Sequence, residues 1–262
     1  MQIAMSSLLF SQQPLPDALA ELARLGMTHV DVGALQGWCH LQPSDLLQDA
    51  GRETAALRRG LDATGLTPVA LNGGLRAPEM DQWRALVALA REFAIPVITL
   101  PPRPKGTDLG QEIDRLRSLV SVADAGGVRL GIETHIGTLT EDPKTALQLV
   151  QAVAGLGLTL DVSHYYCNGW EKAAEALIPF VFHVHLRDCG RGAENIQALM
   201  GEGVVDFAHW FRLLQHNGYR GALTVEYIDL AGVDFDVVAS AVACYRRCQA
   251  LNAGITESRR SD

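Results

Sequence analysis

Short apolar runs rich in β-branched residues alternate with longer segments along the whole chain. Each run is short and is bounded by polar or turn-forming residues, which is typical of buried β-strands. Eight such runs are found, at 2–10, 29–35, 67–72, 96–101, 129–135, 158–164, 181–188 and 222–228. The spacing therefore predicts eight strands separated by other elements.

The segments between the runs carry apolar residues at i, i+3, i+4 and i+7, which indicates amphipathic helices. Clear examples lie at 15–26, 80–93, 109–127, 142–155 and 205–218. Eight consecutive βα units predict an α/β fold, a single (β/α)8 TIM barrel. A doubly wound sheet is the main rival, and it would usually place a glycine-rich phosphate turn after its first strand. Here the first strand leads into FSQQPLPD, and the chain has no G-x-G-x-x-G or Walker sequence.

The length agrees with one barrel. At roughly 150 residues per domain the 262 residues would suggest two domains, but a (β/α)8 barrel occupies about 250 residues as a single unit, and eight βα units leave no room for a second domain. We expect the barrel to span 1–255 and a polar, frayed C-terminal tail to follow at 256–262.

Composition and net charge indicate which class of partner the protein does not bind. The chain is 48% hydrophobic and 20% charged, as in ordinary soluble globular proteins. It has 22 Lys and Arg against 30 Asp and Glu, so the net charge is −8. An acidic chain without a basic run repels a phosphate backbone, and we expect no nucleic-acid partner.

The chain also lacks the signals of export and of membrane insertion. Its N-terminus does not resemble a signal peptide, and no run reaches the roughly 18 apolar residues of a membrane span. We expect a cytoplasmic protein without a membrane partner. Its five cysteines form no C-x-x-C pair, so we expect buried thiols, not disulfides or a zinc knuckle.

Ionisable residues gather at the ends of the second four strands. In a (β/α)8 barrel the chemistry lies at the C-terminal ends of the strands. The first four strands contain only Asp31 and Asn72 as clear polar residues. Strands five to eight instead end in carboxylates and imidazoles: Glu133, His135, Asp161, His164, His183, His185, Asp188 and Glu226.

A divalent cation would satisfy several such groups together, since burying them unpaired is costly. Three carboxylates and one imidazole make a mostly oxygen site with three negative charges. That donor set favours Mn²⁺, with Mg²⁺ and Co²⁺ as alternatives, and it suits Zn²⁺ less well.

Each residue also has a simpler interpretation. Glu133 or Glu226 taken singly would be explained by an ion pair with a neighbouring Arg, but together on strands five and eight they favour a site. His183 and His185 share a face, and His185 is our choice of ligand because it lies nearer the strand end. His183 is equally well explained as a hydrogen-bonded core residue. His135 is expected to hydrogen-bond to the site from outside it.

Aromatic residues in two loops are candidates for a roof over the pocket, although ordinary loop packing explains them nearly as well. They are Trp38 and His40 after the second strand, and Tyr165, Tyr166 and Trp170 after the sixth.

Five segments, taken in order, resemble the sugar isomerase/epimerase group of xylose isomerase-like barrels. They are LGIETH, LDVSHYY, HVHLRDCGRG, GEGVVDF and LTVEYI. This family includes ketose 3-epimerases, hydroxypyruvate isomerases and inosose dehydratases, with endonuclease IV as a distant relative. Strands two to four lack the histidines of endonuclease IV, which argues against DNA repair.

The resemblance implies one divalent metal and a set of site residues. The implied ligands are Glu133, Asp161, His185 and Glu226. The resemblance further implies substrate contacts by His164 and Arg191, to which we add His135 and Trp38. Residues 201–207 are expected to open the seventh helix. One departure concerns ketose epimerases, which carry a substrate-contacting Glu where this chain has Leu139.

These observations predict a metal-dependent isomerase or epimerase of carbohydrate metabolism. It would act on a small sugar, keto-sugar or polyol by enediolate proton transfer between Glu133 and Glu226. The alternative is a lyase that expels a β-hydroxyl, as inosose or dehydroshikimate dehydratases do, and a non-catalytic sugar-binding barrel ranks third. We expect a small-molecule carbohydrate as the partner, and a homodimer or homotetramer as the assembly.

Overall fold

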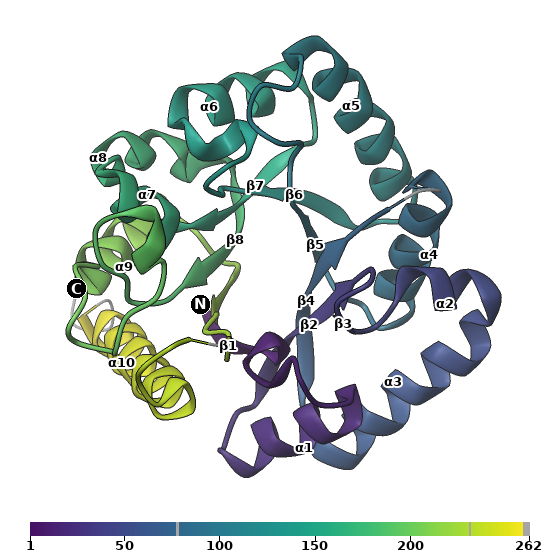
Figure 1. The fold of residues 1–262 in the computed structure, drawn as a ribbon, viewed down its shortest axis with the longest axis horizontal. Coiled ribbons are helices and arrows are strands. Elements are labelled where there is room, and N and C mark those ends of the chain that lie inside the picture. Colours follow the sequence, from purple (N-terminus) through teal and green to yellow (C-terminus); the bar gives the residue numbers. More distant parts are fainter. Residues whose placement is uncertain (77–78, 231, 259–262) are drawn as a thin grey trace.

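A computed structural model describes residues 1–76, 79–230 and 232–258. Eight parallel strands form a closed barrel at its centre (Figure 1). They are β1 (Gln2–Ser6), β2 (His29–Leu35), β4 (Thr67–Gly74), β5 (Val97–Leu100), β6 (Arg129–Glu133), β7 (Gly157–Asp161), β8 (Val181–Leu186) and β9 (Ala222–Val225). The barrel closes because β1 pairs with β9 on one side and with β2 on the other. The predicted single (β/α)8 barrel is thereby confirmed, and the doubly wound alternative is wrong.

Helices form a ring around the barrel in the order of the chain (Figure 1). They are α1 (Leu15–Arg24), α2 (Pro43–Gln48), α3 (Ala50–Thr64), α4 (Glu79–Glu92), α5 (Leu109–Ala125), α6 (Pro143–Ala152), α7 (Val162–Asn168), α8 (Glu171–Ala174), α9 (Phe207–His216) and α10 (Val237–Ser258). A two-residue strand, β3 (Cys39–His40), pairs antiparallel with the end of β2. Short 3₁₀ segments lie at Ser7–Phe10, Leu139–Glu141, Glu175–Phe180 and Ala193–Asn195.

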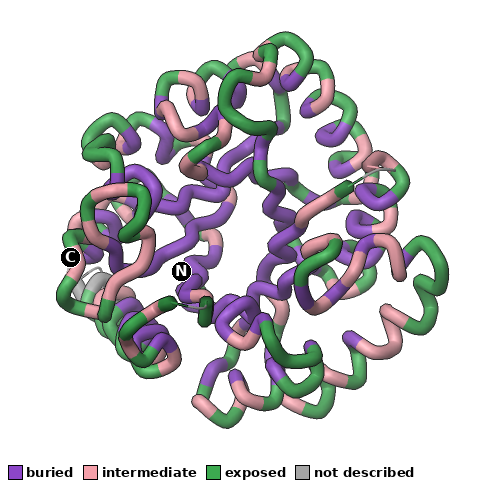
Figure 2. The backbone as a smooth tube through the Cα atoms, viewed as in Figure 1, coloured by how far each residue is buried: buried purple, intermediate pink, exposed green. Residues whose placement is uncertain are grey.

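A large apolar core joins the strands to the inner faces of the helices. Figure 2 shows the buried residues concentrated in the barrel and the exposed residues on the outer ring. Trp83 on α4 is fully buried, and its indole N–H donates to the carbonyl of Leu119 on α5 at 2.8 Å. This hydrogen bond joins two neighbouring helices of the ring.

Two predicted strands end earlier than expected because a capping side chain starts a helix. The sixth run was expected to continue to 164, but β7 ends at Asp161. The Asp161 carboxylate accepts from the Ser163 N–H at 2.9 Å, which is a helix N-cap, so α7 begins at Val162. His164 therefore lies on the first turn of α7. Likewise, Ser6 caps the 3₁₀ segment that starts at Ser7, so β1 ends at Ser6.

The C-terminal helix is longer than expected. α10 runs to Ser258, so the first three residues of the expected tail belong to a helix, and residues 259–262 lie outside the described residues. The five cysteines are free and buried. Among the described residues, no helix is long and apolar enough to cross a membrane.

Candidate metal centre

Four buried side chains from adjacent strands converge at the C-terminal end of the barrel. Glu133 ends β6, Asp161 ends β7, His185 lies on β8 and Glu226 follows β9 directly. One potential ligand atom from each of these residues lies within 4.8 Å of the others. The structure thus brings together the four side chains that the sequence singled out as ligands.

His185 connects this group to a deeper layer of the barrel. Its Nδ1 lies 3.1 Å from Oε1 of Glu133 and 3.3 Å from Oε2 of Glu226. Its Nε2 lies 3.2 Å from Oδ2 of Asp31. Burial alone would lower the pKa of His185, but Glu226, Asp31 and Glu133 outweigh it and raise that pKa well above its ordinary value. The surrounding carboxylates therefore strongly favour a positive charge at this place.

His183 and Asp31 form the deeper layer. Nε2 of His183 is 3.1 Å from Oδ2 of Asp31 and 3.0 Å from the Thr224 hydroxyl. Burial opposes ionisation of Asp31, yet its bonds to the two imidazoles hold its pKa at about 2. His183 thus takes the hydrogen-bonded core position, one of the two roles that the sequence left open. Asp31, His183 and His185 also form a second compact group of potential ligand atoms.

Glu226 has a hydrogen-bond donor on each carboxylate oxygen. Asn72 on β4 donates from Nδ2 to Oε1 at 2.7 Å, and Arg187 donates from Nη1 to Oε2 at 2.9 Å. Burial opposes ionisation, but His185 and Arg187 overcome it, so the pKa of Glu226 lies below its ordinary value. Glu133 is more open, with its side chain 11% exposed against 4% for Glu226.

Asp161 is held in a similar way. Its Oδ1 accepts from the N–H and the hydroxyl of Ser163, and its Oδ2 accepts from Nη2 of Arg187 at 2.7 Å. Burial, which the attraction of Arg187 offsets only in part, raises the pKa of Asp161 above its ordinary value. Hydrogen bonds thus hold both oxygens of Asp161, one of whose atoms lies within 4.8 Å of the other potential ligand atoms.

Arg187 is the main site residue that the sequence analysis missed. It is buried, and it joins Asp161 to Glu226 through one guanidinium. A signal was present, because Arg187 follows His183 and His185 at the two-residue spacing that places side chains on one face of a strand. Buried arginines are rare unless paired, and the pairing partners here are two of the predicted ligands.

The two histidines predicted to act on the substrate lie side by side. The rings of His135 and His164 are 4.0 Å apart, and Nε2 of His164 faces Nη2 of Arg187 at 3.2 Å. Burial, with the nearby His135 and Arg187, lowers the pKa of His164 well below its ordinary value. The Ile136 N–H also donates to Nδ1 of His164 at 3.3 Å, so donors face both ring nitrogens, and this arrangement disfavours a protonated ring.

The other two predicted substrate residues lie at the surface in this structure. The Arg191 guanidinium pairs with Glu171 on α8 at 2.7 Å and donates to the Tyr166 carbonyl. Trp38 is 45% exposed. Neither belongs to the four-residue ligand group. Tyr165 and Tyr166 are buried, and Tyr165 donates its hydroxyl to the carbonyl of Thr140.

Asp188 anchors the backbone of the segment that precedes α9. Its carboxylate accepts from the backbone N–H groups of Gly201, Gly203 and Val205 at 2.9, 3.1 and 3.3 Å. Asp206 then caps α9. The segment 201–207 thus leads into this helix, as expected, and it is anchored by Asp188.

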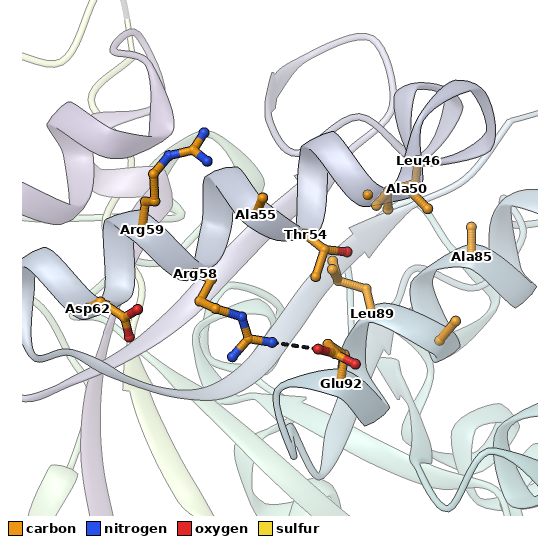
Figure 3. A pocket seen from close by; sticks show the side chains of 12 residues that line it. Leu46, Ala50, Thr54, Ala55, Arg58, Arg59, Asp62, Ala85, Leu89 and Glu92 are labelled. Carbon is orange, nitrogen blue, oxygen red and sulfur yellow. Dashed lines mark hydrogen bonds and ion pairs between the residues drawn. The ribbon is translucent and has the colours of Figure 1, made fainter.

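A second feature, the groove between α3 and α4, lies on the outer ring (Figure 3). It has a volume of about 610 Å³ and is lined mostly by small and apolar side chains, with the ion pair of Arg58 and Glu92 at one end. Its lining residues among those that the structure describes lie on α2, α3 and α4 and include no His or Cys. We therefore place the chemistry at the barrel end.

The donor set fits a divalent cation. Three carboxylates and one imidazole nitrogen are buried within 4.8 Å of one another, and hard divalent ions prefer such oxygen-rich sets. Nε2–H of His185 can donate to Asp31, which leaves the Nδ1 lone pair facing the carboxylates. Glu133, Asp161, His185 and Glu226 are thus suited to hold the ion.

Comparison with known proteins agrees with this architecture. The family model of the xylose isomerase-like TIM barrel matches residues 19–248. The chain therefore belongs to the xylose isomerase-like TIM barrel family, and the resemblance found in the sequence is confirmed.

Individual relatives are distant. Inosose dehydratase from Serratia proteamaculans is 27% identical over an alignment of 135 positions, and the match covers 43% of this chain. The match spans 45% of the length of that dehydratase. A xylose isomerase-like protein from Mycobacterium smegmatis in complex with magnesium has a TM-score of 0.79 at 15% identity, covering 95% of this chain and 96% of its own. A D-tagatose 3-epimerase-like protein has a TM-score of 0.76 at 18% identity, and the match covers 97% of this chain and 100% of that protein. The two structural matches show the shared fold.

Proposed function

We propose that this protein is a divalent-metal-dependent isomerase or epimerase of a small sugar, keto-sugar or polyol. The observation that carries the proposal is the convergence of Glu133, Asp161, His185 and Glu226 at the barrel end. Mn²⁺ is the ion we expect, with Mg²⁺, Co²⁺ and Zn²⁺ as alternatives. The magnesium bound by the structural relative from Mycobacterium smegmatis supports a divalent ion of this kind.

The ion would polarise adjacent carbonyl and hydroxyl oxygens of the substrate and acidify the C–H between them. In the proposed reaction Glu133 removes that proton, because it is the more open of the two glutamates. In an epimerase Glu226 would return a proton on the other face, so it must enter the cycle protonated, and proton exchange with solvent must restore both glutamates after each turnover. In an isomerase Glu133 would return the same proton to the neighbouring carbon. His135, His164, Arg191 and Trp38 are proposed to contact the sugar hydroxyls. Arg191 would have to leave Glu171 to do so.

One observation favours a dehydratase as the second candidate. Both oxygens of Glu226 accept hydrogen bonds, from Asn72 and Arg187, which makes this carboxylate a poor proton acceptor. If Glu226 is a poor proton acceptor, Glu133 is left as the single base. One base is sufficient for the loss of a β-hydroxyl from a keto-polyol. The inosose dehydratase relatives support the same alternative.

The test combines a metal assay with a substrate panel. Purified protein should contain or be activated by a divalent ion, and its absence would remove the premise. Free and phosphorylated ketoses, keto-inositols and hydroxypyruvate are then incubated with Mn²⁺ in D₂O. Deuterium at the carbon next to the carbonyl, detected by NMR, indicates an isomerase or epimerase. A new enone absorbance indicates a dehydratase.

Three variants assign the roles. Glu133→Gln should abolish deuterium exchange, whereas Glu226→Gln should retain exchange but lose net epimerisation. Glu112→Gln is the matched control, because Glu112 is a buried carboxylate on α5 outside the site. Full exchange in both site variants would contradict the two-glutamate scheme.

A further inference from the structure

Arg187 is fully committed to protein partners. Nε lies 3.1 Å from the Ser163 hydroxyl and 3.1 Å from the Ile196 carbonyl. Nη1 donates to the carbonyl and to Oε2 of Glu226, both at 2.9 Å. Nη2 donates to Oδ2 of Asp161 and faces Nε2 of His164. An arginine has five N–H donors, and these partners occupy all five. Arg187 thus has no donor left for a substrate.

The partners of Arg187 are the same carboxylates that a divalent ion would use. Asp161 and Glu226 belong to the ligand group, and Arg187 reaches both. A carboxylate oxygen has two lone pairs, so each can accept from Arg187 and still face an ion. The guanidinium and the ion therefore share two carboxylates.

The negative charges of the ligand group explain why a permanently charged side chain is needed at the position of Arg187. Glu133, Asp161 and Glu226 bring three negative charges into a buried group, and Asp31 lies in the layer below. Charges buried without compensation are strongly destabilising. Arg187 neutralises one of the three ligand charges, and the two that remain match a divalent ion.

We infer that Arg187 is a built-in counter-cation of the proposed metal site. It holds Asp161 and Glu226 together when no ion is bound. It also weakens the affinity for the ion, because a guanidinium on two of its ligands repels a divalent cation. The site should therefore exchange its metal and not retain it permanently. This inference rests on the proposed function.

The experiment compares three variants of the full chain. Arg187→Met removes the charge and keeps much of the length, while Arg187→Lys keeps the charge without the planar fork. Arg115→Met is the matched control, because Arg115 pairs with Glu79 and Glu112 away from the site. The readouts are the melting temperature of metal-free protein and the Mn²⁺ dissociation constant from calorimetric titration.

For metal-free Arg187→Met we expect a melting temperature about 5 °C or more below that of Arg115→Met. Its Mn²⁺ binding should be about tenfold or more tighter than in the wild type. Arg187→Lys and Arg115→Met should bind Mn²⁺ within about threefold of the wild type. Equal or weaker Mn²⁺ binding by Arg187→Met would overturn the inference, because a residue that only positions the ligands would give that result.

Three further measurements address a variant that does not fold, a wild type that binds no ion, and the effect of removing one carboxylate charge. If Arg187→Met does not fold alone, refolding with Mn²⁺ should rescue it, and failure of that rescue overturns the inference. If the wild type binds no divalent ion, the proposed function fails, and metal-free stability then decides the role of Arg187. The double variant Asp161→Asn/Arg187→Met should melt above Arg187→Met, since one uncompensated charge is gone. No rise in melting temperature would overturn the inference.

Discussion

Asp31 on β2 and His185 on β8 are joined across the barrel by a contact of 3.2 Å between Oδ2 and Nε2. Because an ionised carboxylate only accepts hydrogen bonds, Nε2 of His185 carries the proton of this pair. Nδ1 is left facing Glu133 and Glu226. A carboxylate behind a ligand histidine orients the ring and makes its free nitrogen more basic.

Asp31→Asn should weaken Mn²⁺ binding about 10- to 100-fold, since the amide no longer supplies a negative charge behind His185. Calorimetric titration measures the dissociation constant. Glu112→Gln serves as the control, because it also neutralises a buried carboxylate but leaves the site intact. Equal affinity in the wild type and Asp31→Asn would contradict the orienting role.

Metal binding should release a proton from His185 near neutral pH. Burial lowers the pKa of His185, but Glu226, Asp31 and Glu133 raise it well above 6.5, so the metal-free imidazole is protonated at pH 7. A ligand imidazole must lose the Nδ1 proton, so the affinity should rise with pH, by about tenfold per unit below that pKa. Titrations in two buffers of different ionisation enthalpy count the proton. No proton release at pH 7 would be the contrary result.

Gly203→Ala should lower the free energy of unfolding by about 1–3 kcal/mol. A Cβ on Gly203 would clash with Oδ1 of Asp188 and would lie 2.6 Å from the Cys189 carbonyl oxygen. The backbone bonds that anchor this segment to Asp188 would have to shift. Urea denaturation measures the change.

Gly254→Ala is the control for this substitution. Gly254 lies in α10 with open space around it, and there the same change should stabilise by up to about 1 kcal/mol. Equal effects of the two substitutions would contradict the steric argument.

Arg191→Ala should change the free energy of unfolding by less than about 1 kcal/mol, because the ion pair with Glu171 is largely exposed. If Arg191 contacts substrate, as we propose, the same variant should raise KM in the assay that identifies the reaction. Glu171→Ala is the informative partner variant, because it removes the ion pair that Arg191 would have to leave, and it should not raise KM. An unchanged KM in Arg191→Ala would remove Arg191 from the proposed substrate site.

The local sequence determined the strands, most helices and the end of the barrel where the chemistry lies. Strand and helix periods depend on neighbouring residues, so they are visible along the chain. The ligand candidates were also visible, because barrel strands end at one rim and Glu133, Asp161, His185 and Glu226 occupy these ends. The α7 boundary was missed, because the capping by Asp161 competes with the strand pattern.

Only the tertiary structure decided how these side chains are paired. Asn72 reaches Glu226 across 154 positions of the chain, and His185 reaches Asp31 across an equal separation. Such contacts depend on closure of the barrel and on strand register, which local patterns do not encode. The place of Arg187 between Asp161 and Glu226 is of the same kind. The sequence by itself determined which groups reach the barrel end, whereas the closed barrel decided which charges meet there, since electrostatic pairing depends on distance in space.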